Sequence, residues 1–169
     1  DREALLNGII DGSIDMIATD HAPHSIEEKS RGLRDSLNGV VGLETAFPLL
    51  YTNLVKTGKI TLQHLINLMS VNPSKRFDIA QRDCVCIYDL NDSYTIDSND
   101  FLSKGKATPF EGWKVYGRCI ATICNGKLVY IDNGLKEELI KKVQEINSKQ
   151  FIITKEEDPK CKILSTYLT

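Results

Sequence analysis

The sequence predicts an α/β protein, because the spacing of its apolar residues changes along the chain. Up to about residue 80, a short strand pattern is followed by a long loop and two helical patterns. From residue 83, apolar and polar residues alternate, which is typical of strands. The dipeptide Asn125-Gly126 separates two such stretches and is a strong signal for a β-hairpin.

Composition and charge exclude several classes of protein. Of 169 residues, 41% are hydrophobic and 26% are charged, as in ordinary globular proteins. A formal net charge of −2 argues against electrostatic binding of nucleic acid. No apolar run approaches the roughly 20 residues that span a bilayer. Residue 1 is Asp, and no signal peptide follows it. The five cysteines, an odd number without a zinc-binding spacing, fit a reducing cytoplasm. We therefore expect a cytoplasmic protein with neither a membrane nor a nucleic-acid partner.

The first quarter of the chain predicts one helix and one strand. Leu5, Leu6, Ile9 and Ile10 give residues 2–10 an apolar side, and Gly12 ends this helix. Residues 13–20 predict a strand, because a short apolar core lies between glycine and a polar cluster. Residues 25–42 predict a long charged loop, and such loops in compact proteins are usually functional.

Two helices are predicted next. Residues 44–56 have apolar side chains at the helical period, and Gly58 ends this helix. Thr61 is the expected N-cap of a second helix over residues 62–70. Asn72-Pro73 is expected to end it, because proline lacks the N–H that a helix interior needs.

The second half predicts strands and then a helix. The expected strands are 84–90, 94–96, 114–123 and 127–131. Residues 135–148 return to a helical period, and residues 151–169 have no assigned role. One strand with two helices does not close a sheet, because its edges and apolar faces need partners. Either the later strands complete one mixed sheet with it, or the chain is part of something larger, and the absence of Met at residue 1 favours the second interpretation.

The densest group of reactive side chains is Asp20-His21-Ala22-Pro23-His24, at the end of the predicted strand. In parallel α/β folds, sites lie at the carboxyl ends of strands. A carboxylate there can bind a cation and transfer protons. A polar loop with a capping Asp and two solvated histidines explains the same residues, so spacing alone leaves both interpretations open.

Five motifs carry a resemblance to a known family. They are IATDHAPH (17–24), EEK (27–29), GVVGLETAFPLL (39–50), NPSKRF (72–77) and FLSKGKATPFEGWKVYG (101–117). Together they resemble the signature of dihydroorotase, a member of the amidohydrolase superfamily. Hydantoinases and allantoinases share a strand-end Asp-His pair, but TDHAPH followed by GLETA points to dihydroorotase. The resemblance covers about residues 1–132.

The resemblance implies a fold and a domain division. Members of this family are metal-dependent (β/α)₈ barrels of the TIM type with a small β-sandwich. This chain would supply the C-terminal fragment: the last barrel strand and helices in residues 1–80, and part of the sandwich in residues 81–132. Residues 133–169 would be a helical tail of unknown role. A whole barrel needs about 250 residues, more than the chain has.

The resemblance also implies a reaction and a site. Dihydroorotase interconverts L-dihydroorotate and N-carbamoyl-L-aspartate in pyrimidine biosynthesis, with one or two zinc ions. Asp20 would bind zinc and act as general base, while His24, Asn38 and Gly39 would contact the substrate. His21 has no family role and is expected to support the strand end. The remaining zinc ligands are not in this chain, so we expect the chain alone to be inactive and to bind zinc weakly.

The expected partners are a small-molecule substrate and the missing N-terminal part of the same enzyme. A homodimer and an association with aspartate transcarbamoylase are further expectations from the resemblance. Two alternatives stay open. The chain is a non-catalytic interaction module related to dihydroorotase, or it belongs to an amidohydrolase for another cyclic ureide such as hydantoin or allantoin.

Overall fold

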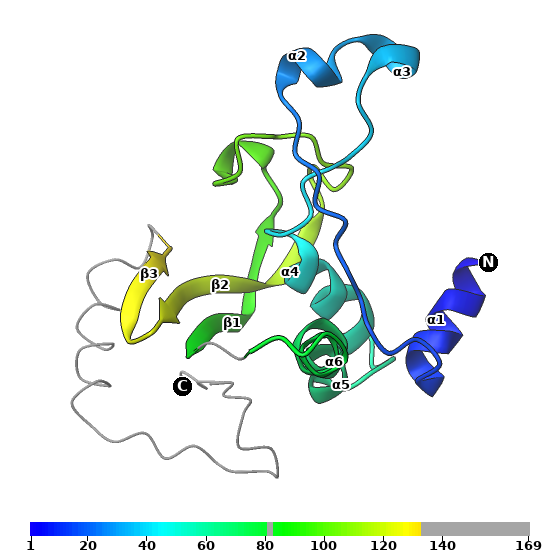
Figure 1. Cartoon of the computed structure of the whole chain (residues 1–169), viewed down its shortest axis with the longest axis vertical. Helices are drawn as coiled ribbons and strands as arrows, with labels where there is room; N and C mark the ends of the chain where they lie inside the picture. The colour runs from blue at the N-terminus through cyan, green and yellow to red at the C-terminus, as the bar shows by residue number, and fades with distance from the viewer. Residues whose placement is uncertain (81–82, 133–169) are drawn as a thin grey trace.

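The computed structural model describes residues 1–80 and 83–132. The predicted helix 135–148 and the tail 133–169 lie outside the described residues. Figure 1 shows most of the helices gathered on one side and a β-sheet on the other, while α2 and α3 project at the far end of a long extended segment. The helices are α1 (Arg2–Asp11), α2 (Ile26–Lys29), α3 (Gly32–Asp35), α4 (Ala46–Leu50), α5 (Leu62–Ile66) and α6 (Asn72–Arg76).

The helices predicted in the first part of the chain are confirmed, but the predicted end of the last of them is wrong. α1 ends at Gly12, which has a left-handed φ of 84°. The helix predicted over 44–56 is α4 followed by a π-helical stretch, Tyr51–Val55. The Thr61 side chain caps α5 by accepting a hydrogen bond from the His64 N–H at 3.1 Å.

The prediction that Asn72-Pro73 ends the second helix is wrong. α5 continues through a π-helical stretch, Asn67–Val71, directly into α6. The Asn72 N–H bonds to the carbonyl of Asn67, five residues earlier, so the backbone widens just before Pro73. A wider turn accommodates a proline ring, which has no N–H to donate and crowds the preceding turn of a regular helix.

The strand predicted over residues 13–20 does not form. This segment is extended and carries no regular secondary structure. Strands need a neighbouring strand that takes up their backbone hydrogen bonds, and among the described residues none lies beside it. Ile17 N–H donates to Leu68 O at 3.0 Å, and His21 forms an isolated bridge with Val40. The loop predicted over 25–42 contains α2 and α3.

The sheet is antiparallel, with the order β1-β2-β3. Its strands are β1 (Cys84–Thr95), β2 (Lys114–Cys124) and β3 (Lys127–Ile131). The hairpin is confirmed: Asn125 and Gly126 have φ values of 51° and 72°, as a type I′ turn requires. The prediction of separate strands 84–90 and 94–96 is wrong, because β1 runs through both. Its register shifts between Asp89 and Ser93, where the Asp89 carboxylate accepts two backbone N–H groups.

The core joins the helices to one another and to the sheet. Leu54, Ile60, Leu65 and Leu68 form a buried cluster that side chains of α1 and α4 cover. The helix face packs against β2, where Tyr116 N–H donates to Thr52 Oγ1 at 2.8 Å. The Phe47 ring lies 4.1 Å from the Tyr88 ring. The division of the chain at residue 80 stays a prediction. In the part of the chain that the structure describes, no helix is long and apolar enough to cross a membrane.

Candidate active site

Asp20 stands at the end of the extended segment in an unusual backbone conformation. Its φ is 47°, in the left-handed region that non-glycine residues rarely adopt and that is found at functional sites more often than elsewhere. Its side chain is exposed and makes no hydrogen bond or ion pair with the residues that the structure describes. The carboxylate is therefore available to a ligand or to a proton.

His21 fixes the path of the chain next to Asp20. Its Nδ1 atom accepts hydrogen bonds from the N–H groups of Gly42 and Leu43, at 3.1 and 3.3 Å. Accepting at Nδ1 means that this nitrogen carries no proton, so the ring is neutral with its proton on Nε2. The ring thus ties the end of the extended segment to the residues that lead into α4, which agrees with the supporting role expected for His21.

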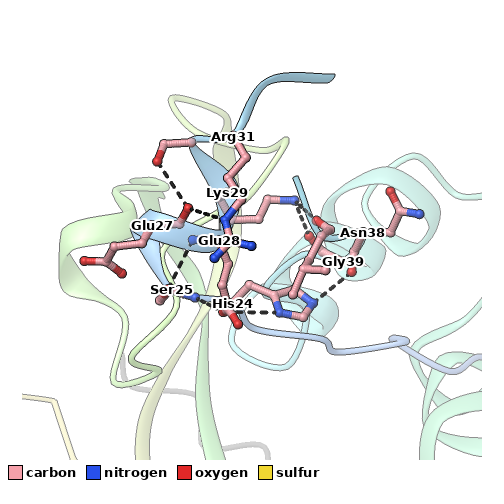
Figure 2. A network of polar contacts seen from close by, with 10 residues as sticks. His24, Ser25, Glu27, Glu28, Lys29, Arg31, Asn38 and Gly39 are labelled. Atoms are coloured by element: carbon pink, nitrogen blue, oxygen red, sulfur yellow. Dashed lines mark hydrogen bonds and ion pairs between the residues drawn. The ribbon is translucent and has the colours of Figure 1, made fainter. Parts of the chain in front are cut away.

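His24 is half-buried, and both of its ring nitrogens face protein groups (Figure 2). Nε2 lies 2.9 Å from Asn38 O, and because a carbonyl only accepts, Nε2 carries the proton and donates it. Nδ1 lies 3.6 Å from a carboxylate oxygen of Glu28. The sequence predicted His24, Asn38 and Gly39 as one group, and the structure brings them together.

Glu28 also caps α2. Its carboxylate accepts the Ser25 N–H at 2.9 Å, while the Ser25 hydroxyl accepts the Glu28 N–H at 3.3 Å. This reciprocal pair is a capping box. The Ser25 N–H lowers the pKa of Glu28 most, and nearby His24 lowers it further, while desolvation opposes both. Glu28 is thus held as an anion beside the His24 ring.

Residues 37–39, named the turn, are a short irregular segment whose three carbonyl groups all accept hydrogen bonds (Figure 2). The Lys29 ammonium donates to Leu37 O at 2.9 Å and to Gly39 O at 3.0 Å. His24 donates to Asn38 O. Within the described part of the chain, the N–H groups of Asn38 and Gly39 have no hydrogen-bond partner. The turn therefore presents two open donors beside His24.

Gly39 is required by the shape of this turn. Its φ is 135°, and a Cβ atom there would lie 2.6 Å from both the Cβ and the carbonyl oxygen of Ala22. Real Cβ atoms essentially never come that close to other heavy atoms. Only glycine fits both the conformation and the space.

The loop that contains Gly105 packs against Pro23 and His24. A Cβ on Gly105 would lie 2.7 Å from the Cβ of Pro23 and 3.0 Å from the backbone of His24. The Glu44 carboxylate accepts the N–H groups of Leu102 and Ser103, at 2.6 and 3.0 Å, and so anchors that loop. Lys29, Glu44 and Gly105 have no role that the sequence predicted. A glycine within FLSKGK was the one available signal of close packing.

A cavity of about 480 Å³ lies elsewhere, between the start of α4 and the sheet. Its lining includes Glu44, Thr45, Tyr94 and Arg118, and it includes none of the predicted site residues. Thr45 Oγ1 is buried there without a partner among the described residues. At the predicted site, the Asp20 side chain is exposed and His24 is half-buried.

Zinc is the metal that the family implies. Asp20 offers one oxygen ligand, and zinc sites in enzymes usually have three protein ligands. In residues 1–80 and 83–132, no three His, Cys, Asp or Glu side chains are grouped as a metal site would need. The described residues therefore do not fit a complete zinc site.

Comparison with curated proteins connects the chain to one enzyme family. It is 48% identical to the dihydroorotase of Ligilactobacillus salivarius (strain UCC118) and 49% identical to that of Geobacillus sp. (strain WCH70), each over 77% of this chain. The chain is homologous to dihydroorotases. It spans about a third, 32%, of the length of each of these dihydroorotases. A search of protein-family models gave no match.

Solved structures similar to this dihydroorotase homologue include hydantoinases. An L-hydantoinase from Arthrobacter aurescens is 30% identical with a TM-score of 0.65, covering 75% of this chain and 31% of that one. A D-hydantoinase from Thermus sp. has a TM-score of 0.70 at 24% identity, covering 78% and 31%, and shows the fold alone. The predicted α/β class and the likeness to the amidohydrolase superfamily are confirmed. The expected barrel strand and sandwich are not shown.

Proposed function

We propose that this chain is the C-terminal part of a zinc-dependent dihydroorotase, which interconverts L-dihydroorotate and N-carbamoyl-L-aspartate in pyrimidine biosynthesis. The identity of 48–49% to dihydroorotases over 77% of the chain carries this proposal. The chain would act within a longer polypeptide, because it spans 32% of those relatives and holds one of the metal ligands. Exposed apolar side chains support this reading, among them Leu5, Leu43 and Leu102.

The turn at residues 37–39 suits the substrate of this reaction. Dihydroorotate carries ring carbonyls and a carboxylate, which are hydrogen-bond acceptors. The open N–H groups of Asn38 and Gly39 are donors, and His24 Nε2 becomes a third donor when a substrate oxygen replaces the Asn38 carbonyl. Buried or partly buried donors that face acceptors give orientation as well as affinity. We assign substrate binding to these three residues.

Asp20 has the properties of the proton-transfer group. Hydrolysis of a cyclic amide needs a base to take a proton from the attacking water, and the amide nitrogen must be protonated before the C–N bond breaks. An exposed carboxylate without a partner in the described part can do both in turn. Zinc, when bound, would supply a nucleophile at neutral pH and polarise the carbonyl. Asp20 would be one ligand, and the other ligands would come from outside the described residues.

The experiment is a hybrid enzyme in which this chain replaces the matching segment of the Ligilactobacillus salivarius dihydroorotase. We expect the hybrid to interconvert dihydroorotate and carbamoyl aspartate. Asp20→Asn should lower kcat by about 10²–10⁴-fold, because general acid–base catalysis is worth that much. Asp15→Asn changes an exposed carboxylate on the same extended segment and is the matched control. Equal kcat values for the Asp20 variant and the unsubstituted hybrid would contradict the role of Asp20.

The likeness to hydantoinase structures favours a second candidate, an amidohydrolase for another cyclic ureide. Hydantoin shares the ring amide with dihydroorotate but lacks the ring carboxylate. The difference in identity, 30% to the hydantoinase against 48% to the dihydroorotase, makes this the second choice. Association with a second copy and with aspartate transcarbamoylase stays part of the proposal for the longer enzyme, as does a cytoplasmic location.

A further inference from the structure

We infer that Lys29 is a positioning residue, which holds the turn at residues 37–39 in the shape that receives the substrate. This inference rests on the proposed function for its substrate and on the geometry of Figure 2 for its mechanism. Lys29 itself touches the protein backbone and acts through Asn38 and Gly39.

Few interactions within the turn fix its conformation. It belongs to no helix or strand, and Asn38 is exposed. Gly39 occupies a conformation open to glycine alone, and glycine is the residue with the most backbone freedom to lose. Bonds from outside must therefore fix the turn. Of the three bonds to its carbonyl oxygens, Lys29 makes two and His24 makes one.

Lys29 is itself held in place. It is the last residue of α2, whose first turn is closed by the capping box of Ser25 and Glu28. Its own carbonyl accepts the Ser36 hydroxyl at 2.9 Å, and the Leu37 N–H bonds to the Glu28 carbonyl at 3.2 Å. α2 thus serves as a platform from which one ammonium group reaches both ends of the turn.

The carbonyl groups of the turn already accept hydrogen bonds, so the turn can bind a ligand only through its N–H groups. With the oxygen atoms of Leu37, Asn38 and Gly39 all accepting from side chains, the groups left open in the described structure are the N–H donors of Asn38 and Gly39. Removing the Lys29 ammonium should weaken the contacts of the Asn38 and Gly39 N–H groups with the substrate. It should not change the position of Asp20.

The test uses the hybrid enzyme with Lys29→Met, which keeps the apolar stem and removes the charge. Losing two charge-assisted bonds should raise KM about tenfold and leave kcat within about twofold, the pattern of lost substrate binding. Hydrogen exchange measured by mass spectrometry should show the Leu37 N–H, and the Ala22 N–H that bonds to Val40 O, exchanging about tenfold faster. Lys29→Arg keeps a cation and should restore part of both values.

Lys59→Met is the matched control, since Lys59 also donates to a backbone carbonyl, that of Asn53, away from the site. It should change neither KM nor exchange at Leu37. Unchanged exchange at Leu37 and Ala22 in the Lys29 variant would overturn the positioning role. Faster exchange with an unchanged KM would overturn the link to the substrate. Failure of the proposed function appears separately, as an unsubstituted hybrid that does not turn over dihydroorotate, and the exchange measurement still tests Lys29.

Discussion

At the scale of single residues, the site depends on groups whose roles come from their backbone neighbours. Asp20 has a left-handed backbone, and Gly39 has a conformation and a space that exclude every other residue. His21 and His24 are close together in the sequence but have different hydrogen-bonding roles. His21 accepts hydrogen bonds from two backbone N–H groups, and His24 donates one to the Asn38 carbonyl.

Gly39→Ala tests whether the turn is as tight as the structure has it. The added methyl group would lie 2.6 Å from Ala22 atoms and would also meet an unfavourable φ. We expect the free energy of unfolding to fall by about 2–4 kcal/mol, the range for combined strain and steric overlap. Urea denaturation measures it.

Gly12→Ala separates the two effects, because Gly12 also has a positive φ, of 84°, with nothing within 4 Å of an added Cβ. Its cost should be about 1 kcal/mol, from the backbone alone. If the two variants lose the same stability, the close contact of Gly39 with Ala22 is wrong.

At the scale of elements, local patterns predicted what local interactions determine. The Thr61 cap, the Gly12 helix end and the Asn125-Gly126 hairpin all follow from a few neighbouring residues and are confirmed. The strand over 13–20 failed because a strand depends on a partner that the segment itself does not encode. The end at Pro73 failed because a π turn, which has no known sequence signal, widened the helix before the proline.

The register of β1 and β2 makes a prediction about two cysteines. Cys84 and Cys124 are directly opposite, and the bond from Asn125 N–H to Asp83 O flanks the pair, so the pair is not itself hydrogen-bonded. Such pairs have Cα atoms about 4.5 Å apart, within the range that a disulfide spans.

Oxidised glutathione should therefore link Cys84 to Cys124. One thiolate attacks the glutathione disulfide and releases one glutathione, and the second thiolate displaces the other, so the chain loses two hydrogen atoms. Peptide mapping by mass spectrometry without reductant identifies the link, and Cys124→Ser should abolish it. A link between Cys84 and Cys119 would show that the register is wrong.

At the scale of the whole molecule, the sequence predicted which residues of the site belong together but not what supports them. The resemblance to dihydroorotase placed His24, Asn38 and Gly39 in one group, and the structure brings them together. Glu44 and Gly105 were missed because their contacts join segments about 60 and 80 residues apart in the chain. Lys29 was missed because its two bonds go to backbone carbonyl groups, which every residue has. An open site, with its exposed carboxylate and its unoccupied donors, is what the proposed longer enzyme would complete.

The most direct test of the central claim is the ratio of kcat/KM for dihydroorotate to kcat/KM for hydantoin, measured on the unsubstituted hybrid enzyme. We predict a ratio of at least about 10², because a site with donors for a substrate carboxylate strongly disfavours an analogue that lacks it. A ratio below one would contradict the proposed function and favour a hydantoinase.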